Sequence, residues 1–230
     1  MSAVTLERPW LTFDLGEQMQ VLSWAINRPG FVMANQIVWR EVCNADLPRD
    51  LDVVEWFGSE LKARDVQDAV AFLTSRDVAF FHDKTVRIDE TEVRCVATVG
   101  LSNAERIGNR EDRSTMDWGT INVAVRVNEA LSQTALIEMM SIATQARTAA
   151  IMDAGVRVSS GVATGTGTDC IAVAAPCGTV DYVGLHTQIG ETVGAAAYAA
   201  TAEGAMQWKA DIALLLAQAA EAGKTNDHDG

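Results

Sequence analysis

The residues best suited to acid–base chemistry lie in the C-terminal half of the chain. His186, in GLHTQIGETVG, stands five residues before Glu191, and Asp169 closes the glycine-containing run GTGTD. A histidine that moves a proton needs a carboxylate to orient it and donors for a developing oxyanion. Two helical residues five apart point about 140° from each other. His186 and Glu191 can therefore face one pocket only if His186 lies in the loop before the helix.

The glycine segment SGVATGTGTDCIAVAAP could bind a phosphate or form a turn that carries polar groups. Gly165 and Gly167 match the first two positions of G-x-G-x-x-G, but the third is a cysteine and a strand follows instead of a helix. A turn with backbone at positive φ is favoured, and its N–H groups could bind an oxyanion. Thr166, Thr168 and Asp169 then lie at the end of a buried strand, where an aspartate often also bonds its own loop.

Other polar groups leave their roles open. Asn103, in GLSNAERIG, and Asn122, in the strand GTINV, could bind an amide, because asparagine both donates and accepts; an exposed sheet face would also explain Asn122. Glu138 begins a polar stripe on a long helix, ending at Thr148, which faces either solvent or a cavity. His186, Glu191 and Asp169 could also bind a metal ion, but no specific ligand spacing is present.

The hydrophobic pattern predicts the elements that must position these groups. Alternating or continuous apolar runs predict strands at 11–15, 21–26, 31–42, 86–99, 119–127 and 171–175. Helices are expected at 65–75, at 132–153 between an N-cap at Ser132 and a stop at Gly155, and from Thr187 or Glu191 to about 222, with a possible break near Gly204. The order lacks strict β-α-β alternation. It favours an α+β fold, a layered sandwich of mixed or antiparallel β-sheet with long helices.

Composition narrows the class of protein. The chain has 230 residues, a net charge of −13 and a hydrophobic fraction of 48%. The acidic surface disfavours nucleic acid and anionic membranes as partners. The four cysteines form no C-x-x-C pair, and neither a signal peptide nor a membrane span is visible, so a reduced cytoplasmic protein is expected. A single domain is expected over 1–222, with a disordered tail at 223–230.

Five segments in one order make a more specific pattern. They are GLSNAERIG, GTINV, ALIEMMSIATQARTAA, GTGTDCIAVAAP and HTQIGETVG. Together they closely resemble the adenosylcobinamide amidohydrolase (CbiZ) family over about 93–201, while the first ninety residues fit more loosely and the tail does not fit.

The resemblance implies a reaction and a substrate. Members of this family hydrolyse the amide that joins aminopropanol to the corrin ring side chain of adenosylcobinamide. The product, adenosylcobyric acid, re-enters coenzyme B12 synthesis, and some members also accept pseudo-B12. No cofactor is certain, because the cobalt-containing corrinoid is the substrate. A corrinoid-binding carrier without hydrolase activity is the alternative, and the alanine-rich helices make a homodimer plausible.

The resemblance also implies site residues. The positions that match the family pattern are Asn103, Asn122, Glu138, Thr166, Thr168, Asp169, His186 and Glu191. His186 is expected to move the proton, with Asp169 or Glu191 orienting it or activating water. The asparagines, Glu138 and the threonines are expected to contact substrate amides, and the backbone at Gly165 and Gly167 to bind the oxyanion. Coordination of the corrinoid cobalt by His186 is a second possibility.

Overall fold

The computed structural model describes residues 3–43, 45–48, 50–109 and 119–226. Its main sheet contains β1 (Ala3–Glu7), β2 (Trp10–Ser23), β3 (Gly30–Glu41), β4 (Val70–Thr74), β5 (His82–Ile88), β6 (Thr91–Val99), β8 (Ile121–Val127) and β12 (Cys170–Ala175). The order is β4-β3-β2-β12-β8-β6-β5, with β1 beside β2. The pairs β8–β12 and β3–β4 are parallel and the others antiparallel, so the sheet is mixed.

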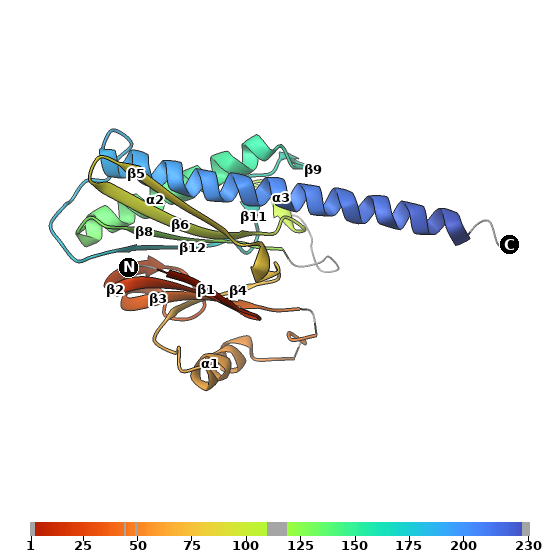
Figure 1. Ribbon diagram of the computed structural model, residues 1–230, viewed down its shortest axis with the longest axis horizontal. Helices are drawn as coiled ribbons and strands as arrows, with labels where there is room; N and C mark the ends of the chain where they lie inside the picture. Colours follow the sequence, from red (N-terminus) through yellow and green to blue (C-terminus); the bar gives the residue numbers. More distant parts are fainter. Residues whose placement is uncertain (1–2, 44, 49, 110–118, 227–230) are drawn as a thin grey trace.

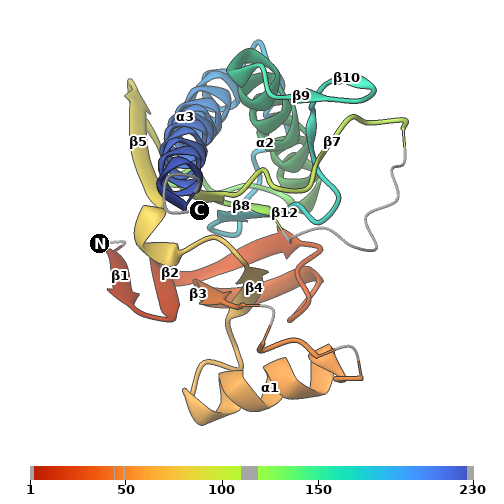
Figure 2. The ribbon, with the colours of Figure 1, turned by 90° about the vertical axis from the view of Figure 1, so that its right-hand side faces the viewer.

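The molecule is layered around this sheet (Figures 1 and 2). Two long helices, α2 (Gln133–Ala154) and α3 (Gln188–Asn226), lie side by side over the face formed by β5, β6, β8 and β12. The N-terminal strands turn beneath the other face of the same strands, and α1 (Val53–Ala63) covers their outer side. The predicted α+β layered sandwich is confirmed.

The alternation in β8 explains how one strand serves two cores. Ile121, Val123 and Val125 point into the core beneath α2 and α3. Ala124 points the opposite way, into the core that the sheet closes against its own N-terminal strands. Asn122 shares that side by the two-residue period of a strand, and it is almost fully buried. An asparagine thus sits between two apolar layers, where its amide must find partners.

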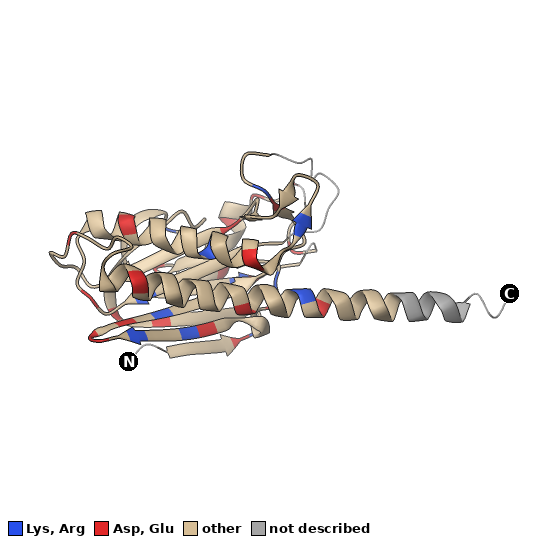
Figure 3. Cartoon of the chain, turned by 90° about the horizontal axis from the view of Figure 1, so that it is seen from above, with Lys and Arg blue, Asp and Glu red and all other residues tan. Residues whose placement is uncertain are grey.

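The two long helices begin and end as their sequences indicate. Ser132 caps α2 by accepting the N–H of Ala135, and Gly155 ends it at φ 70°. Both helices carry few charged side chains (Figure 3). Helix α3 runs through Gly204 without a break. The glycine allows close packing there, because a Cβ would lie 2.6 Å from Cγ2 of Val99. It reaches Asn226, four residues past the predicted end, and 227–230 lie outside the described residues.

Most predicted strands are confirmed, but the helix predicted at 65–75 is wrong. That segment contains β4, which pairs in parallel with β3. Its run VAFLT is almost wholly buried, and a continuous apolar run fits a covered strand as well as a helix. The helix of this region is α1, where the carboxylate of Asp52 accepts the N–H groups of Val54 and Glu55.

Short elements complete the chain around the ends of these strands. They are the 3₁₀ helix η1 (Val78–Phe80), β7 (Ala104–Glu105), β9 (Arg157–Val158), β10 (Gly161–Val162) and β11 (Gly165–Thr166). The strand β7 pairs with β11, and β9 pairs with β10. Among the described residues no helix is both long and apolar enough to cross a membrane.

A half-buried histidine links the sheet edge to α3. Burial lowers the pKa of His82, an effect that Glu203 opposes from 3.6 Å and that Lys84 and Arg76 reinforce. The folded state therefore favours the neutral imidazole. As pH falls below about 6.5, the ordinary pKa of histidine, this imidazole binds a proton more readily in the unfolded chain than in the folded protein. The contribution of His82 to the free energy of unfolding is therefore fully present above about pH 6.5, and it is lost as the pH falls through the lower pKa of the folded state.

We expect acidification to destabilise the wild type more than a His82→Gln variant. Urea unfolding at about pH 7.5 and about pH 5.5 measures the difference, because the carboxylates common to both proteins cancel in the comparison. Equal losses for the two proteins would show that His82 does not contribute.

Candidate active site

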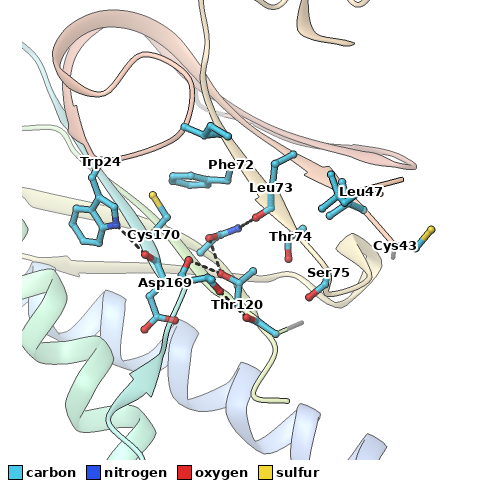
Figure 4. Close-up of a pocket in the computed structure, with 15 residues that line it drawn as sticks. Trp24, Cys43, Leu47, Phe72, Leu73, Thr74, Ser75, Thr120, Asp169 and Cys170 are labelled. Atoms are coloured by element: carbon cyan, nitrogen blue, oxygen red, sulfur yellow. Dashed lines mark hydrogen bonds between the residues drawn. The ribbon is translucent and has the colours of Figure 1, made fainter. Parts of the chain in front are cut away.

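Two adjoining cavities open at the end of the sheet where β8 and β12 begin. One measures about 360 Å³ and the other about 540 Å³, and both are lined by Trp24 and Asp169. The smaller, drawn in Figure 4, is mainly apolar and lies between the β2–β3 connection, the end of β4 and the starts of β8 and β12. The larger, called the polar cavity below because most of its lining residues are polar or charged, lies between β7, β11 and the middle of α2.

A buried ion pair stands on the wall of the polar cavity. Nη1 of Arg147, from α2, lies 2.7 Å from Oδ2 of Asp169, and the two side chains are only 12% and 7% exposed. The same Nη1 donates to the carbonyl oxygen of Thr164 at 2.8 Å. Asp169 also accepts the N–H of Thr166 at 3.0 Å and its hydroxyl at 2.5 Å, and the N–H of Ile121 at 3.2 Å. These bonds lock β11 to the start of β8 and to α2.

This environment suits a structural carboxylate better than a proton carrier. Burial raises the pKa of Asp169, while Arg147 and the donors from Thr166 and Ile121 favour the charged form. Every oxygen of the carboxylate has a protein partner. Asp169 therefore holds its own loop in place, and its ion pair with Arg147 also ties that loop to α2.

Gly165 is required by space, not by backbone conformation. A Cβ at this position would lie 2.0 Å from Nη1 of Arg147 and 2.4 Å from Oδ2 of Asp169. Positive φ occurs in this segment at Gly161, with φ 131°, and not at Gly165 or Gly167. Nor is this stretch a plain turn, because Gly165 and Thr166 form β11 against β7.

The backbone N–H groups that follow Gly165 and Gly167, the positions expected to bind an oxyanion, are engaged within the protein. The N–H of Thr166 bonds Asp169, and that of Thr168 points to the Thr166 hydroxyl at 3.4 Å. The hydroxyl of Thr168 donates to the carbonyl of Gly119 at 2.8 Å. These bonds hold the cavity wall together. The basic side chains that line the polar cavity are those of Arg106 and Arg147.

The two asparagines also hold the site together from within. Nδ2 of Asn122 donates to the carbonyl of Leu73 at 2.7 Å and so ties β8 to the end of β4 (Figure 4). Nδ2 of Asn103 points to the Thr168 hydroxyl at 3.4 Å, and its Oδ1 is buried without a partner among the described residues. Asn122 lines the apolar cavity, whereas Asn103 lies behind the wall.

Three predicted site residues lie at the opposite end of the sheet. The side chain of Gln188, two residues after His186, donates to the carbonyl of Ile88 at the β5–β6 turn. That turn is remote from Asp169, because β6 pairs its far end, Val99, with Ile121. The seven residues of β8 span about 20 Å between the two ends.

His186 and Glu191 are exposed at that distant end, and Glu138 accepts the N–H of Val183 there at 2.7 Å. The expected grouping of His186 and Glu191 with Asp169 is therefore not formed, either as an acid–base set or as a metal site. No cluster of three metal-ligating side chains occurs in the parts of the chain that are described.

The structure also brings in residues that sequence reasoning missed. Arg147 is the one basic residue of α2, and a single basic residue in the middle of an alanine-rich helix was the available signal. Glu105, in the quoted motif GLSNAERIG, faces the polar cavity beside Gly167. Of the predicted polar stripe on α2, only Thr148 lines this cavity, joined by Thr144 and Arg147. Cys170 lines the apolar cavity, but burial raises its thiol pKa to about 12, which disfavours a nucleophilic thiolate.

Fold and cleft together describe an α+β protein with two neighbouring cavities of different lining at one end of its sheet. Comparison with protein families makes this specific. The model of adenosylcobinamide amidohydrolase matches residues 2–213, and the chain belongs to that family. It is therefore an amide-bond hydrolase, and the match also covers the first ninety residues, where the sequence resemblance was looser. A search of curated proteins finds no match.

Proposed function

We propose that this protein hydrolyses the aminopropanol amide of adenosylcobinamide in the cleft around Asp169 and Arg147, releasing adenosylcobyric acid for corrinoid salvage. One observation carries the location. The segments at 103–106 and 165–169, both among the motifs of the family resemblance, pair as β7 and β11 and contribute to the wall of the polar cavity. Residues far apart in sequence thus build one surface.

The cavity offers a base and positive charge for the reaction. Glu105 lines it beside Gly167. Glu105 takes a proton from water, and the resulting hydroxide adds to the amide carbon. The guanidinium groups of Arg106 and Arg147 line the same cavity and favour the oxyanion. Glu105 then returns the proton to the leaving nitrogen as the C–N bond breaks, so that one water is consumed.

The direct test is to incubate the pure protein with adenosylcobinamide and to follow the products by mass spectrometry. Equimolar adenosylcobyric acid and aminopropanol are expected. Tight binding without product would favour the corrinoid carrier, and absence of binding would overturn the proposed function. Adding pseudo-B12 in parallel tests whether complete cobamides are also substrates.

A His186→Ala variant separates the two ends of the sheet. Because His186 is exposed and lies about 20 Å from Asp169 along β8, we expect its turnover to fall less than tenfold. The measurement is kcat for adenosylcobinamide with folding checked by circular dichroism. A fall of several orders of magnitude would move the chemistry to the His186 end and contradict the location proposed above.

A further inference from the structure

The smaller cavity has walls that suit a flat apolar group. Leu47, Phe72, Ile26 and Val42 line it, together with the indole of Trp24. The Trp24 side chain is 48% exposed, yet its Nε1–H donates to the carbonyl oxygen of Asp169 at 2.9 Å, which fixes the position of the ring. A large exposed aromatic that is held in place offers a stacking surface at small entropic cost.

The polar groups in this cavity are already bonded within the protein. Thr120 donates its hydroxyl to the carbonyl of Thr168 at 2.9 Å, and Asn122 donates to the carbonyl of Leu73 at 2.7 Å. The hydroxyl oxygen of Thr74 accepts the N–H of Arg76 at 3.1 Å. A ligand group therefore gains contact and stacking here and few new hydrogen bonds, so a primary amide, which offers no ring to stack, fits poorly.

The size of the cavity restricts what part of a corrinoid can enter. About 360 Å³ is near the lower limit of ligand pockets and is small for a whole corrin macrocycle with its side chains. Outside the macrocycle, adenosylcobinamide carries amide chains, the aminopropanol group and the adenosyl group on cobalt. Only the adenosyl group contains a flat aromatic ring.

We infer that the apolar cavity is the binding site for the adenosyl group of the corrinoid, with adenine stacked on Trp24. This assignment rests on the proposed function, because the adjoining polar cavity then receives the amide to be cleaved. Trp24 and Asp169 line both cavities, so one substrate reaches both at once. The site thereby distinguishes adenosylated corrinoids from those with another upper ligand.

Two matched ligands test the inference by equilibrium binding, followed through the corrinoid absorbance after ultrafiltration. Adenosylcobinamide and methylcobinamide share the macrocycle and the cobalt–carbon bond and differ in the adenosyl group. Stacking of a base on an aromatic side chain implies that wild type binds adenosylcobinamide roughly tenfold or more tightly. Trp24→Ala is expected to remove most of that preference. Leu47→Trp, which fills the apolar cavity alone, is expected to do the same while changing methylcobinamide affinity less than twofold.

The control variant is Tyr182→Ala, which removes an aromatic that is 77% exposed and lines neither cavity. It should keep the preference of the wild type. Equal weakening of both ligands by Trp24→Ala and Leu47→Trp, or no weakening, would overturn the adenosyl assignment while leaving the hydrolase intact. Failure of the wild type to bind either ligand would instead overturn the proposed function.

Thiol labelling gives a second readout that does not depend on turnover. Cys43 and Cys177 are the exposed thiols of the described chain, and only Cys43 lines the cavity. In a Cys177→Ser background, adenosylcobinamide should slow labelling of Cys43 several-fold, whereas methylcobinamide at equal occupancy should not. Equal protection by both ligands would contradict the assignment.

Discussion

Replacing Arg147 with methionine is expected to lower the free energy of unfolding by about 3–5 kcal/mol, the usual cost of removing one partner from a buried ion pair. The side chains of Arg147 and Asp169 are 12% and 7% exposed, so the carboxylate that remains is desolvated without its cation. Urea denaturation followed by circular dichroism measures the loss. Because Arg147 also binds the carbonyl of Thr164, β11 should loosen and amide hydrolysis should fall with stability.

Two comparisons make this prediction specific. Arg87→Met removes an arginine that is 67% exposed in its pair with Glu92, and exposed pairs are worth about 0–1 kcal/mol, so it should cost little. Asp169→Asn added to Arg147→Met removes the stranded charge and should recover part of the stability. If Arg147→Met costs no more than Arg87→Met, the pair does not hold the cavity wall.

Glu105→Gln is expected to lower kcat for adenosylcobinamide by roughly 10²–10⁴-fold, the usual contribution of a positioned general base. The amide keeps the size of the side chain, and substrate binding should change little because Glu105 acts on water. Steady-state kinetics measure kcat and KM separately, and a fall in kcat at nearly unchanged KM is the expected result.

Stability measurements separate this effect from unfolding. The matched control is Glu55→Gln in the first turn of α1, an exposed carboxylate on the far side of the N-terminal strands. It should retain wild-type kcat. If Glu105→Gln also retained wild-type kcat, Glu105 would not be the group that activates water. The assignment of the apolar cavity to the adenosyl group does not depend on this result.

Local signals in the sequence were sufficient to predict most helices and strands. They were not sufficient to predict which of these elements pack or pair with one another. The caps of α2 at Ser132 and Gly155 and the alternation of β8 are read from neighbouring residues, and all three are confirmed. The run VAFLT at β4 fits two periods at once, and only its pairing with β3 decides for a strand.

The site was harder to predict, because its side chains are far apart in the sequence and come together only through the arrangement of the sheet and helices. Asp169 was identified, but its partner Arg147 lies 22 positions earlier on a helix whose orientation depends on the whole sheet. His186 has the chemistry of a general base, yet strand pairing places it at the other end of β8. The residue type of His186 suggested a catalytic function, but the strand order and register place it far from the cleft.

The backbone and side chain of Asp169 serve different cavities. Its carbonyl oxygen holds the indole of Trp24 on the apolar side, and its carboxylate holds Arg147 on the polar side. A shift of this one residue would alter both walls together. Selectivity for the upper ligand and speed of bond cleavage are then not independently adjustable traits at this position. Variants that change one of these properties without the other should instead arise at Leu47, which lines only the apolar cavity, or at Glu105, which lines only the polar cavity.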